Sequence, residues 1–303
     1  LRLAGIIEKL PSYLPEAVQQ QRVAQFVQDY FEMSFKEVDS FPLQQDAGLE
    51  KRWLEVLTRI GIRLTGTTQM LSEAILASGV LQDPVLYAQL QQDLPEIFRQ
   101  NISIDVLVGV YKPRWTKHFS LPTCIDPRND LLGDVESAYD DARYLCEQHY
   151  ISCPQLEIEA NKANTVFPSI PTYNYLILFE IFKNALRATV EHHGEGSSLP
   201  PVKLVLREEA GRLEVRVVDR GGGMAKGQEA TCKSFFNSSA VLQEMSLYQG
   251  AHSSPLAGHG FGLGMASVYC SYWGGGLGVD SREGGTVVSM DWCTDPTLAR
   301  ENV

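Results

Sequence analysis

The chain lacks long hydrophobic runs and an excess of basic residues, and each absence excludes a class of protein. No apolar run approaches the roughly 18 residues of a transmembrane helix. The formal net charge of -11 at pH 7 disfavours sequence-independent binding to nucleic acid, which depends on positive charge. We therefore expect no membrane span and no nucleic-acid partner.

The chain also lacks an ordered cysteine pattern and a targeting signal. Its six cysteines show neither metal-ligand spacing nor a dense framework, so we expect free thiols in a reducing compartment. No Arg/Ser-rich transit segment and no secretory signal opens the sequence. A trimmed leader is consistent with a chain that begins at Leu1 rather than Met.

The first part of the sequence predicts helices. A length of 303 residues suggests two domains. Apolar residues recur at spacings of three and four in three long stretches, after a short leading helix near residues 5–10; the stretches are 19–38, 49–76 and 84–110, the last interrupted or started near Pro95. Short connections between such helices predict an antiparallel bundle over residues 1–120.

The second part predicts an α/β sandwich over residues 121–303. A linker rich in Pro and Lys at 112–127 precedes a helix at 135–150. Short β-type segments follow, with alternating apolar residues, and a Gly-Gly pair marks a hairpin turn at 282–285; the predicted strands are 156–158, 202–207, 213–218, 277–281 and 286–290. We expect a mixed, mainly antiparallel sheet with helices on one face, and hence an α+β fold overall.

One predicted helix carries an unusual polar stripe. Because successive residues turn by about 100°, Glu180, Lys183, Asn184 and Arg187 share one face. A carboxylate accepts protons, an amide oxygen suits Mg²⁺, and cations suit phosphate. The alternative is a solvated helix surface.

Two glycine motifs favour the functional interpretation. In the first, Asp219 ends an alternating strand and precedes a glycine run that includes Gly221 and Gly223, which lets a ligand approach the backbone. The alternative is a simple tight turn.

The second motif spaces glycines at alternate positions before a predicted helix, so that backbone N–H groups and the helix N-terminus would cradle phosphate; it comprises Gly258, His259, Gly260, Phe261, Gly262, Leu263 and Gly264. No Gly-Lys-Ser/Thr follows, so it is not a P-loop. No βαβ unit with a later acidic residue marks a dinucleotide site either.

The three motifs, in this order, resemble the N, G1 and G2 boxes of the GHKL ATP-binding fold. They resemble more closely the mitochondrial protein kinases of 2-oxo acid dehydrogenase complexes. The segments at 180–191, 219–223 and 255–263 carry this resemblance, together with Asp140-Asp141-Ala142-Arg143-Tyr144-Leu145-Cys146 and, more weakly, the N-terminal helices.

The resemblance implies roles for the helix stripe. It makes Glu180 the general base that removes a proton from an attacking Ser hydroxyl. It makes Asn184 the ligand of Mg²⁺, which bridges the phosphates of ATP. Lys183 and Arg187 would support phosphate, order the Glu180 carboxylate, or face solvent.

The resemblance also implies an adenine site. Asp219 would accept the exocyclic amino group of adenine, and Thr286 would lie near the base, although a β-branched residue is also usual at a strand start. The segment between the glycine motifs would form a lid over ATP, with Ser238 and Ser239 as donors to phosphate.

Three positions depart from the family pattern. Ile60 occupies the place where many members carry a His next to an Arg and near the catalytic Glu. Asp105 ends an Ile-Ser-Ile-Asp segment where an Ile-Arg pair is expected, and Gly264 replaces a usual Pro. These departures leave the expectation of ATP binding unchanged, but they predict altered or slow phosphotransfer.

The expected function is that of a serine kinase that inactivates a 2-oxo acid dehydrogenase complex in the mitochondrial matrix. The decarboxylase subunit would be its substrate, the lipoyl domain of the acyltransferase core its docking partner on the helical domain, and a homodimer its assembly. Alternatives are an ATP-binding pseudokinase or scaffold, a histidine kinase, and a gyrase- or chaperone-type ATPase. The histidine kinase alternative needs an acceptor His before an acidic residue, and none of the six histidines fits.

Overall fold

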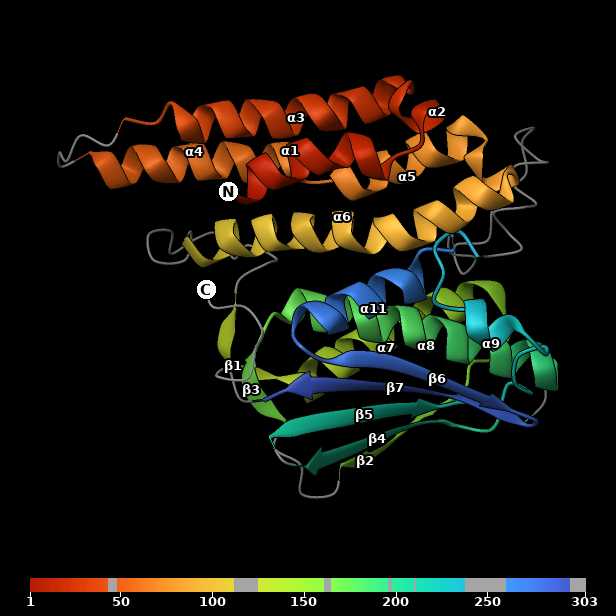
Figure 1. Cartoon of the computed structure of the whole chain (residues 1–303). Coiled ribbons are helices and arrows are strands. Elements are labelled where there is room, and N and C mark those ends of the chain that lie inside the picture. The colour runs from red at the N-terminus through yellow and green to blue at the C-terminus, as the bar shows by residue number, and fades with distance from the viewer. Residues whose placement is uncertain are drawn as a thin grey trace. The chain divides into compact units, whose positions relative to one another are not determined.

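A computed structural model describes residues 1–42, 48–111, 125–160, 165–195, 198–209, 211–237 and 260–294. The chain divides into two units, Leu1–Ile125 and Asp126–Val303 (Figure 1). Most of the predicted linker, at 112–124, lies outside the described residues.

The first unit is helical, as the apolar periodicity predicts. Helices α1, α3, α4 and α6 lie side by side, and α5 packs on α3 (Figure 1). The elements are α1 (Arg2–Tyr13), α2 (Glu16–Gln19), α3 (Arg22–Asp39), α4 (Leu49–Leu64), α5 (Thr67–Ser78), the 3-10 helix η1 (Val80–Gln82) and α6 (Pro84–Tyr111). α6 runs through Pro95 without interruption.

The prediction of one helix over 49–76 was wrong. The helix ends at Leu64 and a second begins at Thr67, because Gly66 adopts a left-handed conformation with φ 84°. Only glycine takes this conformation without steric cost, so the Thr-Gly pair separates two helices that share one apolar periodicity.

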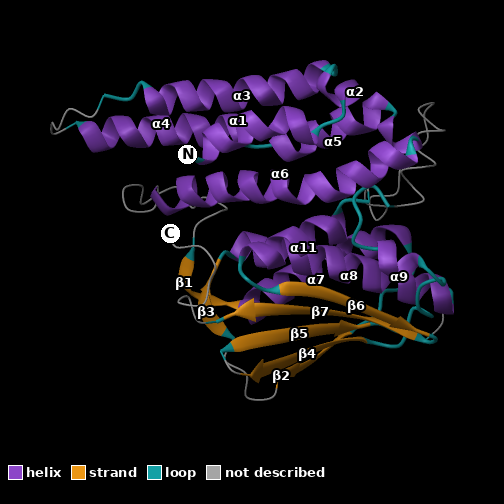
Figure 2. Cartoon of the chain, in the orientation of Figure 1, coloured by secondary structure: helices purple, strands orange, loops and turns teal. Residues whose placement is uncertain are grey.

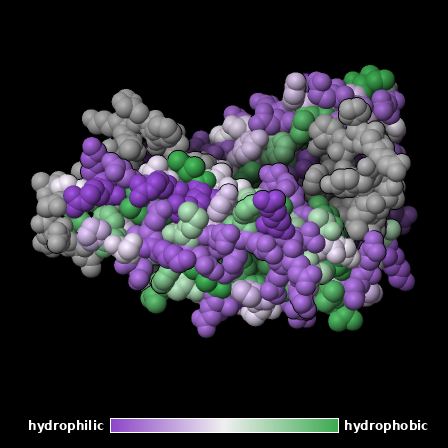
Figure 3. All heavy atoms as spheres, turned by 90° about the horizontal axis from the view of Figure 1, so that it is seen from above, coloured by the Kyte–Doolittle hydropathy of each residue, from purple (hydrophilic) through white to green (hydrophobic). Residues whose placement is uncertain are grey.

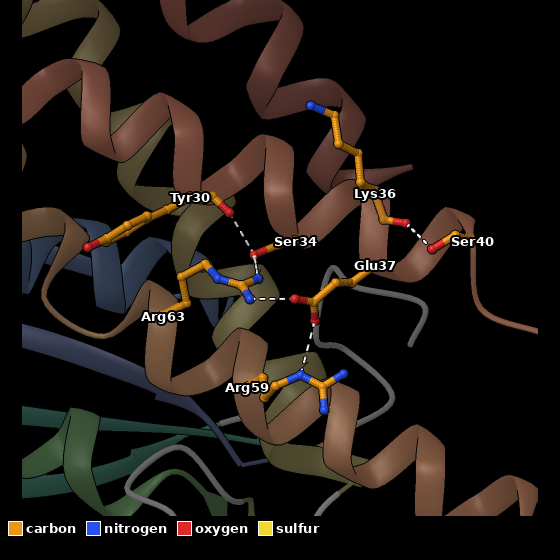
Figure 4. A network of polar contacts seen from close by, with 7 residues as sticks. All are labelled: Tyr30, Ser34, Lys36, Glu37, Ser40, Arg59 and Arg63. Carbon is orange, nitrogen blue, oxygen red and sulfur yellow. Dashed lines mark hydrogen bonds and ion pairs between the residues drawn. The ribbon is translucent and has the colours of Figure 1, made fainter.

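The polar and apolar residues of α4 make different contacts: its arginines pair with α3, and Ile60 packs into the core. Arg63 donates to Glu37 of α3 at 2.5 Å and to Ser34 Oγ at 3.0 Å, and Arg59 lies 3.5 Å from the same Glu37 carboxylate (Figure 4). Ile60 is 1% exposed. The residue next to Arg59 is therefore a core residue of the helical unit.

The second unit contains a five-stranded sheet in the order β2-β4-β5-β7-β6. β2 pairs with β4 in parallel and the other neighbours are antiparallel. Helices α7, α8 and α11 cover one face (Figure 2). The elements are β2 (Leu156–Ala160), β4 (Val202–Glu209), β5 (Arg212–Val218), β6 (Gly276–Arg282), β7 (Gly285–Cys293), α7 (Leu131–His149), α8 (Pro171–His193), α9 (Gln228–Thr231) and α11 (Gly262–Tyr272). The α+β prediction is confirmed.

The core of this unit follows from the alternation of its strands. Val202, Leu204 and Leu206 of β4 are at most 1% exposed, and the alternate residues of β5 are buried in the same way. Each strand thus turns one apolar face towards the helices. On α8, Ile181 and Phe182 pack into the same core.

A two-stranded sheet was missed by the sequence analysis. β1 (Asp126–Asp130) pairs antiparallel with β3 (Val166–Ser169). β1 reads Asp-Pro-Arg-Asn-Asp, which lacks the β-branched and aromatic residues of a typical strand.

The face of the molecule seen in Figure 3 is mainly polar. Among the described residues, no helix is long and apolar enough to cross a bilayer. On the face seen in Figure 3, hydrophilic residues predominate and hydrophobic ones form small separate groups.

Candidate nucleotide-binding site

α8 supplies the central side chains of the site. It begins with Pro171 at its first turn, where the missing N–H has no intrahelical partner to lose. Its apolar face packs against α7 and the sheet. The polar stripe therefore runs along the rest of the helix, with Glu180 partly exposed.

Glu180 is held by an ion pair on one oxygen. Lys183 Nζ lies 2.8 Å from Glu180 Oε1, and the same ammonium stands 5.5 Å from the centroid of the Phe179 ring. Lys183 is 5% exposed, so it does not face solvent. Of its three possible roles, ordering the carboxylate fits this geometry best.

The other oxygen of Glu180 faces the second glycine motif. A Cβ added to Gly262 would overlap Glu180 Oε2, so a larger residue at this point of α11 would displace the Glu180 carboxylate. The structure thus brings the predicted base and the start of the predicted phosphate cradle together.

The remaining residues of the stripe differ from each other. Asn184 is exposed and available to a ligand. Arg187 donates from Nε to Glu191 Oε1 at 2.7 Å, and Tyr150 donates to the same oxygen at 3.0 Å. Arg187 is therefore engaged one turn further along α8 from Asn184, and its contact with phosphate stays a prediction.

Asp219 lies at the end of β5 with 7% exposure. Its Oδ1 accepts the backbone N–H of Gly221 at 2.8 Å and that of Thr286 at 3.2 Å. Oδ2 accepts from no described residue, which leaves it for a ligand. Burial raises the pKa of this carboxyl, and the two N–H donors oppose that shift.

The β6–β7 hairpin fixes the glycine run after Asp219. A Cβ on Gly223 (φ 82°) would overlap Arg282 O. Ser281 Oγ accepts from Met224 N at 2.7 Å and lies 3.3 Å from Thr286 Oγ1. The structure therefore places Thr286 beside Asp219, as the resemblance implies, whereas its contact with adenine stays a prediction.

The C-terminal half of α8 supports the same glycine run from the other side. A Cβ on Gly221 would lie 2.5 Å from Ala188 Cβ, and one on Gly222 would overlap the His192 ring. His193 Nε2 lies 3.0 Å from Arg220 O.

Part of the second glycine motif is described. Gly260 has φ 71°, and its carbonyl accepts the N–H of Phe236 at 2.9 Å. Phe261 packs edge-on against Phe236 at 4.6 Å between centroids. Leu263 packs against the core. The predicted contacts Ser238, Ser239, Gly258 and His259 lie outside the described residues.

A magnesium ion would depend on few protein ligands here. Among the described residues, no group of three or more His, Cys, Asp and Glu is placed to hold a metal ion. Mg²⁺ is commonly bound through one or two protein oxygens together with phosphate oxygens and water. The single exposed amide of Asn184 fits that mode of binding.

Sequence reasoning missed the residues that support Asp219. Ser281 contacts Met224, and His193 contacts the loop of Arg220. A Ser in a hairpin and a His at a helix end are common surface residues, so neither carries a signal in one sequence. The Gly284-Gly285 pair was a signal of close approach: a Cβ on Gly285 would overlap Asp219 O.

Comparisons with known proteins agree with this geometry. The family described as histidine kinase-, DNA gyrase B- and HSP90-like ATPase matches residues 173–295. That range contains the α8 stripe, Asp219 and the α11 turn. The expectation of a GHKL-type ATPase domain is confirmed.

Relatives match most of the chain. A mitochondrial pyruvate dehydrogenase (acetyl-transferring) kinase of Ascaris suum is 30% identical, covering 94% of this chain and 73% of the relative. The kinase of the same name from Drosophila melanogaster is 29% identical, covering 94% and 72%. Isozyme 1 from Homo sapiens is 29% identical, covering 94% and 68%. The chain therefore belongs to the family of mitochondrial pyruvate dehydrogenase kinases.

Proposed function

We propose that the protein is a serine kinase that transfers the γ-phosphate of Mg-ATP to the decarboxylase subunit of a mitochondrial 2-oxo acid dehydrogenase complex and thereby inactivates it. The observation that carries the proposal is the Glu180 carboxylate, which Lys183 orients at 2.8 Å and which lies against Gly262 at the start of α11. This geometry supports a proton acceptor beside the expected phosphate position.

In the proposed reaction, the Ser hydroxyl oxygen forms a bond to the γ-phosphorus while the bond from that phosphorus to the ADP oxygen breaks. The hydroxyl proton moves to the Glu180 carboxylate, and the electron pair of the broken bond stays on ADP. A positioned carboxylate accelerates such a proton transfer by about 10²–10⁴-fold. Lys183 keeps Glu180 in one orientation.

Asp219 accounts for recognition of the base. A buried carboxylate whose Oδ2 accepts from no described residue would accept the amino group of adenine and repel the carbonyl oxygen of guanine. Gly221 and Gly223, which have no room for a side chain, set the backbone around this carboxylate.

Asn184 would hold Mg²⁺ through its amide oxygen. When bound, the metal ion neutralises charge that develops on the phosphate oxygens. The exposed position of Asn184, one residue after the Lys183 pair, fits this role.

The partners follow from the family. The printed names of the relatives describe mitochondrial kinases of pyruvate dehydrogenase, which supports a mitochondrial location and makes the pyruvate complex the first candidate substrate. We further propose that the protein lies in the mitochondrial matrix and forms a homodimer. Its helical unit would dock the lipoyl domain of the complex.

An ATP-binding pseudokinase or scaffold is the second candidate. The observation that favours it is Ile60, an apolar residue where the family pattern suggests a His. Such a protein would bind ATP through Asp219 and a partner through its helices without phosphate transfer.

A side-by-side transfer assay separates these functions and identifies the substrate. Purified protein and radiolabelled Mg-ATP would be incubated with the pyruvate complex and, separately, with the branched-chain 2-oxo acid complex. We expect phosphoserine on a decarboxylase subunit, with loss of that complex's activity. ATP binding without transfer to either complex would refute the kinase function and support the scaffold function. Absence of ATP binding would refute both.

A further inference from the structure

The end of α8 contacts each of the three residues that follow Asp219. His193 lies against Arg220, Ala188 against Gly221, and His192 against Gly222. Two of these contacts are steric and admit only glycine on the loop side. The third is a directed hydrogen bond.

The polarity of that hydrogen bond is fixed by chemistry. Arg220 O is a carbonyl and only accepts, so His193 Nε2 carries the proton and donates at 3.0 Å. Both the neutral Nε2–H tautomer and the imidazolium fulfil this requirement. The end of a helix, where backbone carbonyls concentrate negative potential, also suits an imidazole N–H donor.

Arg220 is directly bonded to Asp219, so the contact acts on the base-reading carboxylate through one peptide unit. On its other side Asp219 is held by β7, through Thr286 N to Oδ1 at 3.2 Å and Asp219 N to Thr286 O at 3.0 Å. The Asp219 loop is thus clamped between β7 and the end of α8.

The geometry points to His193 as a positioning residue for nucleotide-base selection: its Nε2–H, bonded to Arg220 O, holds the Asp219 loop so that Oδ2 meets the amino group of adenine. This inference rests on the proposed function, because it needs Asp219 to read the base. His193 itself touches no substrate.

The consequence is a specific loss of discrimination. Without the donor, the loop shifts on one side while Thr286 still holds the other. Adenine then loses a well-placed acceptor, whereas guanine, which has a carbonyl oxygen at that position, loses a repulsive contact. Affinity for ATP should fall and affinity for GTP should not.

The test measures dissociation constants of Mg-ATP and Mg-GTP by calorimetry for four proteins: the unaltered chain, His193→Ala, His193→Gln and His149→Ala. Gln supplies an amide N–H donor close to Nε2. His149 is the matched control, an exposed His at the end of α7. Thermal unfolding without nucleotide checks that all four are folded.

For His193→Ala we expect ATP to bind about 3- to 10-fold more weakly, as for loss of one hydrogen bond, with GTP affinity changed less than about twofold. His193→Gln should restore most of the ATP-to-GTP ratio, and His149→Ala should leave it unchanged. Transfer at saturating ATP should stay within about twofold in His149→Ala.

Two outcomes would overturn the inference while leaving the proposed function intact. One is an unchanged ATP-to-GTP ratio in folded His193→Ala. The other is an equal loss of affinity for ATP and GTP that Gln does not restore, which would mark a general structural role. An unaltered chain that binds no Mg-ATP would instead refute the proposed function and the inference with it.

Discussion

The two units differ in how they use buried polar groups. In the α/β unit, two buried polar residues belong to the candidate site: Lys183 and Asp219 are 5% and 7% exposed, and both contact neighbours there. In the helical unit, the resemblance placed a His at Ile60 and an Ile-Arg pair in the segment that ends at Asp105. Ile60 is instead apolar and buried, and Asp105 carries the opposite charge. Two of the three departures from the family pattern thus lie in the bundle, and only Gly264 lies where ATP is expected to bind.

The largest expected effect tests the chemistry of the α/β unit. Glu180→Gln keeps the shape of the side chain and removes the proton acceptor. Transfer should fall by about 10²-fold or more while Mg-ATP binding persists, as single-turnover assays and calorimetry would show. Glu147→Gln, at a carboxylate paired with Arg143 on α7, is the matched control. Full activity in Glu180→Gln would show that Glu180 is not the general base.

Ile60→His tests the contrasting position in the bundle. Because Ile60 is a core residue, a polar ring there should lower the free energy of unfolding of the helical unit by about 2–4 kcal/mol. Denaturant unfolding measures this loss, with Ile62→His, at a 69% exposed neighbour, as the control. A variant that keeps its stability and gains transfer would instead support the hypothesis that Ile60 replaces a residue that tunes Glu180.

Asp219→Ala removes the base reader. A hydrogen bond to a charged acceptor contributes roughly 1.5–3 kcal/mol, so ATP should bind about 10- to 150-fold more weakly. In the unaltered protein, burial raises the pKa of Asp219, so ATP affinity should fall on acidification at a higher pH than for an ordinary aspartate. Calorimetry with Asp219→Ala that finds full affinity would refute the assignment.

Asp105 gives the helical unit a pH response of its own. Burial raises the pKa of Asp105 to about 7 from an ordinary value of 3.8. Between these values the unfolded carboxyl ionises while the folded one stays protonated. Stability should therefore fall as pH rises through this window, by at most about 1.4 kcal/mol per pH unit, and level off above about 7. Asp105→Asn should flatten the profile, and an unchanged slope in that variant would exclude Asp105 as its source.

Glycine-to-alanine substitutions in the two units, at Gly5 and Gly262, should have the smallest effects. Gly5 of α1 has open space around it, so Gly5→Ala should stabilise the helical unit by about 0.5–1 kcal/mol. A Cβ on Gly262 would displace the Glu180 carboxylate, so Gly262→Ala should slow transfer by about 10-fold. Thermal unfolding and transfer assays on both variants would measure the contrast; Gly262→Ala with full transfer would show that the carboxylate does not depend on this close approach.

The candidate site was predictable where residue types cluster in short segments. Glu180, Lys183 and Asn184 share one helix face, and Asp219 precedes its glycines, so the chemistry is visible within a few residues of sequence. The close approach of Glu180 to Gly262 and of Asp219 to Thr286 depends on tertiary packing. Only the resemblance to a family suggested those pairings.

The fold was predictable where periodicity is strong. Alternation located β4 and β5, and spacings of three and four located α3 and α6. The break at Gly66 was hidden because the apolar positions continue on both sides of it. Arg187 shows the same limit for side chains, since its ion pair with Glu191 competes with the phosphate contact that its position suggests.

Transfer of phosphate to serine tests the central claim most directly. The chain would be incubated with radiolabelled Mg-ATP and purified pyruvate dehydrogenase complex, and the labelled subunit would be treated with acid before counting. The account predicts acid-stable phosphoserine on the decarboxylase subunit, and none with Glu180→Gln. Acid-labile label on the chain itself, or no label on the complex at any enzyme concentration, would contradict it.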